Sequence, residues 1–266
     1  MPDLAQELLD LALGVGRAAA KLVAERAAAG VSVAATKTND TDVVTEADRA
    51  SEELIRRLVL DRRPGDAFLG EEGDETGGTS GVRWIVDPID GTVNYLYGLP
   101  RYAVSIAAEH DGRVVAGVVI DVPREVEYTA VRTAGGVRAR RNGQPVSVRP
   151  EAPLGQRLIA TGFNYDPGLR RLQAQALVRL LPQIRDIRRA GAAALDLCDV
   201  AAGLVDGYFE EGIHPWDYAA ATLVAEGAGA RWEIATGLGG RPLVVCAPEH
   251  GYDELRSALG TAGFLA

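Results

Sequence analysis

The amino-acid sequence predicts a mixed α and β fold, in which an α+β half (residues 1–150) is followed by an α/β half (residues 151–266). Two patterns predict this class. Between residues 100 and 150 the apolar residues recur with a period of two, which is typical of antiparallel strands. From about residue 157 onward, strand-like runs alternate with segments of helical period. A chain of 266 residues can bury a sizeable core, as one large domain or as two closely packed halves.

The α+β half is expected to begin with two helices. Apolar residues at spacings of three and four predict an amphipathic helix over residues 4–29, which ends at Gly30. A second helix is predicted over residues 45–60, with Thr45 or Asp48 near its start.

A loop and an antiparallel meander are expected next. The segment 73–82 has the Gly-rich composition of a loop. After Pro100, four runs of alternating apolar residues are separated by Asp-Gly, Pro-Arg, Gly-Gly and Asn-Gly turn signals. The α/β half is predicted to contain strands at 157–162, 186–190, 206–210, 230–234 and 242–247, and helices at 168–181, 192–202, 217–227 and 251–259.

The overall charge limits the partners of the protein. The sequence has 28 basic and 37 acidic residues, a net charge of −9, which argues against a chain that mainly coats nucleic acid or an anionic membrane. A protein of this sign that binds phosphate needs local cations, and bound metal ions are the simplest source. Cys198 and Cys246 lack metal-binding spacing and are expected to be reduced and buried, which favours a cytoplasmic protein. Residues 1–16 carry no basic region followed by a long apolar core, so neither a signal peptide nor a membrane span is predicted.

The stretch WIVDPIDG combines a buried strand with two carboxylates. The apolar run 84–86 leads directly into Asp87 and Asp90, which are three residues apart and separated by Pro88. A strand that ends in this turn can point both carboxylates toward one place, while Gly91 lets backbone approach a ligand closely. A cation is the natural occupant between like charges, although Asp-Pro turns also end strands without binding anything.

Other acidic residues strengthen the metal hypothesis. Glu71 and Glu72 follow another short apolar run, and Asp217 is expected at the mouth of a helix. There an aspartate also suits the helix dipole, and a capping role is compatible with metal ligation. All of these ligand atoms are oxygen, which favours Mg²⁺ or Mn²⁺ over zinc.

Three motifs occur in order along the chain: GEE at 70–72, WIVDPIDGTVNY at 84–95 and GIHPWDYAAA at 212–221. Together they resemble the motifs of the inositol monophosphatase family of Mg²⁺-dependent, Li⁺-sensitive sugar-phosphate phosphatases. The similarity extends from KTNDTDVVTEAD at 37–48 to the C-terminal helix. The resemblance implies a layered αβαβα sandwich of the inositol monophosphatase and fructose-1,6-bisphosphatase type. It also implies a homodimer with two or three Mg²⁺ ions per site, for which Mn²⁺ is an alternative.

The resemblance assigns metal-binding roles to single residues. It implies that Glu71, Asp87 and the carbonyl of Ile89 hold a first Mg²⁺. Asp87, Asp90 and Asp217 would hold a second. Glu71 would also reach a third, weaker ion through water. In such a two-metal site, one ion lowers the pKa of water and the other neutralises charge on the leaving oxygen.

The catalytic residues implied by the resemblance lie in the same motifs. Thr92 looks like the family threonine that orients the attacking water, with Asp48 as its partner and Glu71 as the third catalytic residue. Gly91 and Thr92 can offer backbone amides to phosphate at a helix start. Lys37 and Asp42 match positions that line the site.

The substrate contacts are expected mainly from the α/β half. Glu210 matches a family glutamate that hydrogen-bonds a sugar hydroxyl, and Gly191, Ala192 and Ala193 match a helix-start segment whose amides face the substrate. Family members often carry Thr or Ser in place of Ala192, so the detailed polyol contacts stay open. The predicted substrate-binding set is completed by Asp90, Gly91, Thr92 and Asp217, with Phe163 and Asn164 on its rim.

Two further features have competing interpretations. His214 lies beside Asp217 and would be a candidate base, but a histidine at a helix start is more often a structural hydrogen-bonding group. Arg185, Arg188 and Arg189 form a basic cluster that is expected to be a solvated helix end or a subunit contact. Nucleic-acid binding by this cluster is the least favoured of the three interpretations.

The leading functional hypothesis is hydrolysis of inositol monophosphate. Histidinol phosphate is the closest competing substrate, followed by fructose 1,6-bisphosphate and 3′-phosphoadenosine 5′-phosphate, since all could share the metal site. A noncatalytic regulatory binding protein is the alternative of a different class. Such a protein would not need to retain the complete set of catalytic side chains, which are Glu71, Asp87, Asp90, Thr92 and Asp217.

Overall fold

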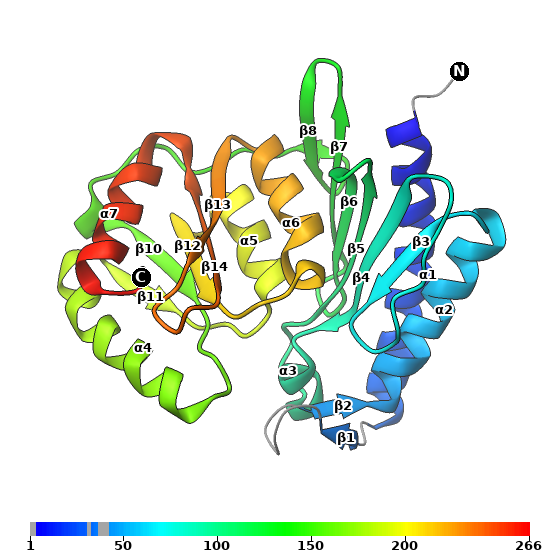
Figure 1. Ribbon diagram of the computed structural model, residues 1–266, viewed down its shortest axis with the longest axis horizontal. Helices are drawn as coiled ribbons and strands as arrows, with labels where there is room; N and C mark the ends of the chain where they lie inside the picture. The colour runs from blue at the N-terminus through cyan, green and yellow to red at the C-terminus, as the bar shows by residue number, and fades with distance from the viewer. Residues whose placement is uncertain (1–3, 31–32, 37–42) are drawn as a thin grey trace.

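The computed structural model of the protein describes residues 4–30, 33–36 and 43–266. Its elements form five layers, α, β, α, β and α, as the sequence led us to expect (Figure 1). The seven-stranded sheet has one helix pair on its outer face, and the five-stranded sheet has another. The middle pair lies between the two sheets. The pairs are α1 (Leu4–Ala29) with α2 (Glu46–Arg62), α5 (Ala193–Ala201) with α6 (Pro215–Gly227), and α4 (Pro167–Leu180) with α7 (Tyr252–Ala262).

The seven-stranded sheet follows the order of the chain, from β3 at one edge to β9 at the other. All neighbours are antiparallel except β3 and β4, which are parallel. The predicted meander is therefore confirmed. Asn142 and Asp111, each followed by glycine, have the positive φ angles that tight hairpin turns require. The strands are β3 (Ala67–Gly70), β4 (Val82–Asp90), β5 (Ala103–His110), β6 (Arg113–Asp121), β7 (Val126–Thr133), β8 (Gly136–Arg141) and β9 (Gln144–Pro145).

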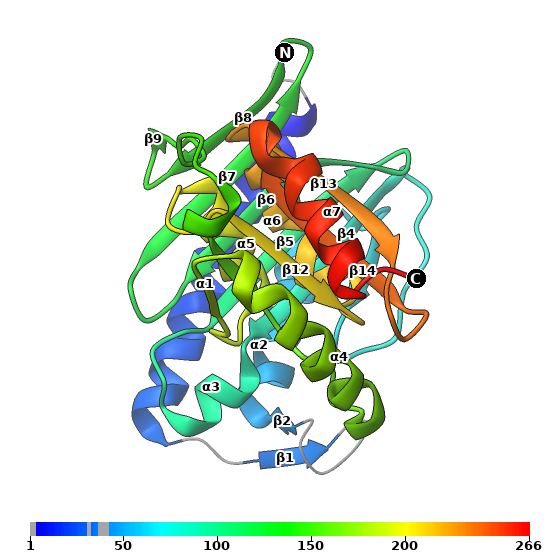
Figure 2. The same ribbon diagram turned by 90° about the vertical axis from the view of Figure 1, so that its left-hand side faces the viewer.

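The five-stranded sheet is mixed and has the order β11, β10, β12, β14, β13. Strand β10 is parallel to both of its neighbours, whereas β14 is antiparallel to β12 and β13. Figure 2 views the molecule from the side on which α4 and α7 cover this sheet. The strands are β10 (Leu158–Thr161), β11 (Asp186–Arg188), β12 (Gly207–Glu211), β13 (Ala230–Thr236) and β14 (Pro242–Pro248).

Short elements were not predicted from the sequence. Two strands, β1 (Val33–Thr36) and β2 (Val43–Thr45), form an antiparallel pair, and the helix α3 (Thr92–Tyr97) lies beside it (Figures 1 and 2). Each of these elements is too short to show a hydrophobic period. Three short 3₁₀ turns also escaped prediction, at Leu154–Gln156, Leu181–Gln183 and Glu249–Gly251.

The middle helix pair packs against both sheets through small side chains. One close contact joins α6 to β6: a Cβ atom added to Gly117 would lie 2.9 Å from the carbonyl oxygen and 3.0 Å from the Cα of Ala220. Glycine at this position therefore lets the helix backbone touch the sheet. Among the described residues, the structure has no helix with the length and apolar character needed to cross a membrane.

Candidate metal and active site

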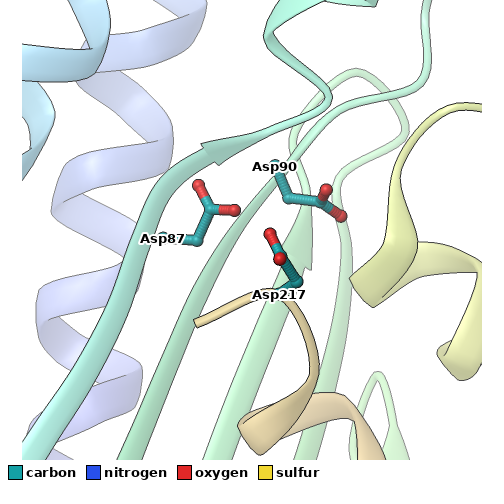
Figure 3. A group of neighbouring side chains, drawn as sticks. All are labelled: Asp87, Asp90 and Asp217. Carbon is teal, nitrogen blue, oxygen red and sulfur yellow. The ribbon is translucent and has the colours of Figure 1, made fainter. Parts of the chain in front are cut away.

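Three aspartates from two distant parts of the chain converge at the carboxyl end of β4. Asp87 and Asp90 belong to β4, whereas Asp217 lies in the first turn of α6. Each offers a carboxylate oxygen, and these three oxygen atoms all lie within 4.8 Å of one another. Figure 3 shows the three side chains pointing toward a common space. We refer to Asp87, Asp90 and Asp217 as the aspartate cluster.

An irregularity in β4 brings the first two carboxylates together. Side chains three residues apart in a regular strand point to opposite faces. Here Asp87 pairs with Ser105 but Asp90 pairs with Ala103, so β4 has one extra residue at this point. Pro88 lies within this bulge, where its missing N–H group costs no ladder hydrogen bond. The extra residue lets both carboxylates face α6.

Backbone amides orient each carboxylate. Asp87 Oδ1 accepts a hydrogen bond of 3.0 Å from the amide of Ile89, and Asp217 Oδ2 accepts one of 2.5 Å from the amide of His214. The second bond closes a capping box at the start of α6, in which His214 is the N-cap residue. Asp217 is therefore the third helical residue and not the N-cap that its position suggested as an alternative.

Asp90 is fixed by the other half of the molecule. Its two oxygens accept hydrogen bonds from the amides of Ala193 and Ala194, at 3.1 and 2.8 Å. These amides begin α5, whose N-cap residue Ala192 supplies no side-chain hydrogen bond. Asp90 therefore caps α5 from outside the helix. The amide of Ala193, which we expected to face the substrate, donates to Asp90 instead.

Burial and mutual repulsion perturb the aspartate cluster. Desolvation raises the pKa of Asp90 to about 7, although its two amide hydrogen bonds act in the opposite direction. Desolvation also raises the pKa values of Asp87 and Asp217 well above their usual range, and the nearby charge of Glu71 adds to both shifts. A bound cation would relieve this repulsion. Oxygen-only ligands suit a hard divalent ion such as Mg²⁺, so the residues present fit the metal expected from the sequence.

The predicted water-orienting pair is in contact. The hydroxyl of Thr92 lies 3.1 Å from Asp48 Oδ1 and 3.0 Å from the carbonyl oxygen of Ile89. Asp48 is fully buried, and its other oxygen accepts hydrogen bonds from the amide and hydroxyl of Thr45 in the capping box of α2. Desolvation raises the pKa of Asp48. One hydroxyl proton serves two acceptors, so the oxygen of Thr92 keeps its lone pairs for a water molecule.

Gly91 packs closely against other parts of the protein. The space that its side chain would fill is occupied by protein atoms and not open to a ligand. Its φ angle is +94°, and an added Cβ would lie 2.9 Å from the carbonyl oxygen of Arg101 and 3.2 Å from that of Gly191. Gly191 also has a positive φ, of +87°. The turn after β4 and the turn before α5 therefore touch through two glycines.

Glu210 lies at the end of β12, on the side of the predicted substrate contacts. Its Oε2 accepts a hydrogen bond of 3.0 Å from the hydroxyl of Tyr208. Desolvation raises the pKa of Glu210 to about 7, and the positive charge of Arg189 opposes this shift. Its carboxylate lies against Gly162, where an added Cβ would be about 2.0 Å away. Asn164, the predicted rim residue, uses its side-chain oxygen to accept from the amide of Asp166.

Two important side chains were missed in the sequence. The amide group of Asn94 in α3 donates to the carbonyl oxygens of Arg101 and Ala190, both at 2.8 Å, and thereby joins α3 to the turn before α5. Glu52 in α2 accepts from the amide of Glu72 at 2.8 Å. Asn94 lies inside the motif WIVDPIDGTVNY, but nothing in the local pattern identifies a partner 96 residues away.

The remaining predicted residues lie at the surface or outside the described residues. His214 is exposed and its ring stacks on Trp216, with centroids 4.8 Å apart. In the basic cluster, Arg185 donates to the carbonyl of Gln156 and Arg188 pairs with Asp186, both at the surface. Lys37, Asp42 and their motif neighbours at 38–41 lie outside the described residues.

Comparisons with known proteins support the same assignment. The chain matches the inositol monophosphatase family over residues 4–255. It is 44% identical over 252 residues to "Inositol-1-monophosphatase" of Mycobacterium bovis, covering 92% of this chain and 87% of the relative. It is 36% identical over 243 residues to "Nus factor SuhB" of Pseudomonas aeruginosa, covering 87% of each.

A solved structure resembles the whole chain. The extragenic suppressor protein suhB from Bartonella henselae superposes with a TM-score of 0.86 and 33% identity, over 95% of this chain and 98% of that one. The shared fold and the family match over nearly the full length agree with the order of the three motifs. The chain therefore belongs to the inositol monophosphatase family and is a phosphatase.

Proposed function

We propose that the protein hydrolyses a polyol phosphate monoester in a Mg²⁺-dependent reaction, with inositol monophosphate as its substrate. The observation that carries this proposal is the convergence of the aspartate cluster beside the Thr92–Asp48 pair. A group of like charges that is largely withdrawn from solvent and oriented by backbone amides is suited to a divalent cation.

The residues of the site divide the work in this proposal. The aspartate cluster, Glu71 and the carbonyl of Ile89 hold the metal ions, two or three in number, with Mn²⁺ as an alternative to Mg²⁺. When bound, the ions lower the pKa of water and neutralise charge on the leaving oxygen. The hydroxyl of Thr92, held by Asp48, orients the attacking water toward phosphorus. Backbone amides at Gly91 and Thr92 bind phosphate oxygens.

Substrate selection is assigned to the face formed by Glu210 and the turn before α5. Glu210 is held by Tyr208 and lies near the charge of Arg189, so it can accept a hydrogen bond from a ring hydroxyl. Gly191 and Ala192 contribute backbone to the same face. The name of the Mycobacterium bovis relative supports inositol phosphate over histidinol phosphate, fructose 1,6-bisphosphate and 3′-phosphoadenosine 5′-phosphate.

The setting of the enzyme is also part of the proposal. We propose a cytoplasmic homodimer that acts on a small phosphate ester and does not bind membranes. The two buried, unpaired cysteines, Cys198 and Cys246, are compatible with a reducing compartment. A purely regulatory role of the kind that the name Nus factor describes for the Pseudomonas relative has less support, because the candidate catalytic side chains are all retained.

The metal assignment is tested with Asp217→Asn. Asparagine can keep its oxygen toward the amide of His214, so the capping bond survives while one charge is lost. Asp90→Asn is a less selective variant, because both oxygens of Asp90 accept backbone amides. We expect Asp217→Asn to lose nearly all phosphate release and most metal affinity, with little change in the unfolding temperature. The matched control Asp61→Asn, at an exposed position of α2, should behave as the wild type.

Removal of divalent ions with EDTA should abolish turnover in the wild type, and added Mg²⁺ should restore it. Undiminished turnover in EDTA or in Asp217→Asn would refute the metal assignment.

The substrate is tested by the ratio of kcat/KM for inositol monophosphate and histidinol phosphate. Glu210→Gln should lower kcat/KM for the inositol ester. The loss should correspond to about 0.5–1.5 kcal/mol of transition-state binding free energy, the usual value of a hydrogen bond to a hydroxyl. A wild-type preference for histidinol phosphate would overturn the substrate but not the metal chemistry.

A further inference from the structure

We propose that Glu52 is a positioning residue that fixes the turn carrying Glu71 in place for metal binding. Glu52 lies on α2, and its residue surface is only 4% exposed. The inference rests on the proposed function in one respect, namely that Glu71 serves the metal site.

The carboxylate of Glu52 holds the backbone next to Glu71. Its Oε2 accepts a hydrogen bond of 2.8 Å from the amide of Glu72, and its Oε1 lies 3.2 Å from Nη2 of Arg56. On the opposite side, the amide of Glu71 donates to the carbonyl of Val86 in β4, at 3.2 Å. The two peptide groups that flank the Cα of Glu71 are therefore tied to different elements.

Two glycines make room for this carboxylate. A Cβ added to Gly70 would lie 2.3–2.6 Å from the carboxylate atoms of Glu52. A Cβ added to Gly73 would lie 2.7 Å from Oε1 of Glu52 and 2.9 Å from Nη2 of Arg56. A side chain at either position would displace the carboxylate of Glu52, so the two glycines that enclose Glu71 and Glu72 leave the space that this carboxylate occupies.

Arg56 extends the attachment to the end of the turn. The same Nη2 atom donates to the carbonyl of Asp74 at 3.2 Å, and the guanidinium lies 4.3 Å from the ring centroid of Phe68. In the Glu52–Arg56 ion pair, Glu52 is buried and Arg56 is partly buried. Each partner also bonds one backbone group of the turn, at Glu72 and at Asp74. Such a pair restricts the turn geometry more strongly than a surface ion pair would.

This restriction matters because Glu71 acts on the aspartate cluster from a turn and not from a strand or helix. Its amide is hydrogen-bonded to Val86, the residue immediately before Asp87, so the turn is joined directly to the strand that carries the cluster. A ligand on a turn needs neighbouring hydrogen bonds to hold it within the narrow range that a metal ion accepts. Glu52 supplies that bond one residue from Glu71.

The test compares Glu52→Ala and Glu52→Gln with Glu53→Ala, which changes an exposed glutamate on the same helix. Mn²⁺ binding to each protein is measured without substrate, by the electron paramagnetic resonance of the free ion. Loss of a hydrogen bond that supports a metal ligand typically weakens metal affinity by about 10- to 100-fold. We expect a loss of this size for Glu52→Ala, an intermediate loss for Glu52→Gln, and none for Glu53→Ala.

A second readout separates positioning from general stability. The Mg²⁺ concentration for half-maximal turnover should rise with the loss of Mn²⁺ affinity, whereas KM for the ester at saturating Mg²⁺ should stay within about twofold. Unchanged Mn²⁺ affinity in both Glu52 variants would overturn the inference, even if their unfolding temperatures fall. If Glu52→Ala does not fold, Glu52→Gln alone decides, because it keeps the volume of the side chain. If the wild type binds no Mn²⁺, the proposed function fails instead.

Discussion

The contact between Gly117 and α6 predicts that one methyl group in a strand disturbs the active site. In Gly117→Ala, the new Cβ would lie 2.9 Å from the carbonyl oxygen of Ala220. An ordinary contact begins at 3.4 Å, so α6 has to move away from β6 by about half an ångström. The obstacle is helix backbone, which cannot rotate aside as a side chain can. Asp217 lies less than one turn before Ala220 and moves with the helix.

The size of the effect follows from this displacement. Overpacking of a well-filled core costs about 1–3 kcal/mol of stability. A misplacement of 1 Å at a catalytic group can cost about a hundredfold in rate, so half of that distance should cost about tenfold. We therefore expect Gly117→Ala to unfold at lower urea concentration and to need more Mg²⁺ for half-maximal turnover, with a reduced kcat.

Urea unfolding and phosphate release across a Mg²⁺ titration measure both effects. The control is Gly14→Ala, on the exposed face of α1, where an added Cβ meets no atom within 4 Å. This change should raise stability by about 0.5–1 kcal/mol, because alanine is the better helix former, and should leave activity unchanged. Wild-type stability and turnover in Gly117→Ala would refute the idea that this contact sets the position of Asp217.

Three further outcomes follow from the site. Between the unfolded carboxyl pKa near 4 and the raised value of about 7 for Asp90, the native metal-free protein binds more protons than the unfolded chain, so its stability should fall as pH rises. Mg²⁺ should therefore raise the unfolding temperature more at pH 8 than at pH 6, and the reverse order would contradict the raised pKa values. Asn94→Ala leaves the carbonyls of Arg101 and Ala190 without their donor and should lower the free energy of unfolding in urea by about 1–3 kcal/mol. A decrease below about 0.5 kcal/mol would show that Asn94 does not hold these segments together. From the family resemblance we expect millimolar Li⁺ to inhibit phosphate release, and insensitivity at saturating Li⁺ would count against that branch of the family.

Long periodic segments were predictable because a single segment carries the whole signal. The helix predicted over residues 4–29 begins at Leu4 and ends at Ala29, since its apolar spacing persists for seven turns. The helix at Asp217 begins two residues earlier than expected, at Pro215, because His214 and not Asp217 occupies the capping position. Proline at the first helical position is a signal that could have corrected this boundary.

The contacts between distant segments were not predictable. The pattern around Asp90 indicates a carboxylate at a strand end, but not that the amides of α5, more than 100 residues later, hold it. Likewise Glu52 looks like one more acidic residue on an amphipathic helix, and its burial depends on two glycines outside that helix. Local periodicity reports which face of an element is buried, whereas the partner is chosen by the packing of the whole chain.

The position of α6 between the sheets also has a consequence for synthesis of the chain. The last strand of the seven-stranded sheet ends at Pro145, and α1 is already present to cover one face of that sheet. The helix that covers the other face begins at Pro215, seventy residues later. At about 5–20 residues per second on the ribosome, most of this face waits roughly 4–14 s for the start of α6. We therefore expect the apolar face of the nascent sheet to be prone to association in that interval. Asp217 is synthesised together with the helix that closes the sheet.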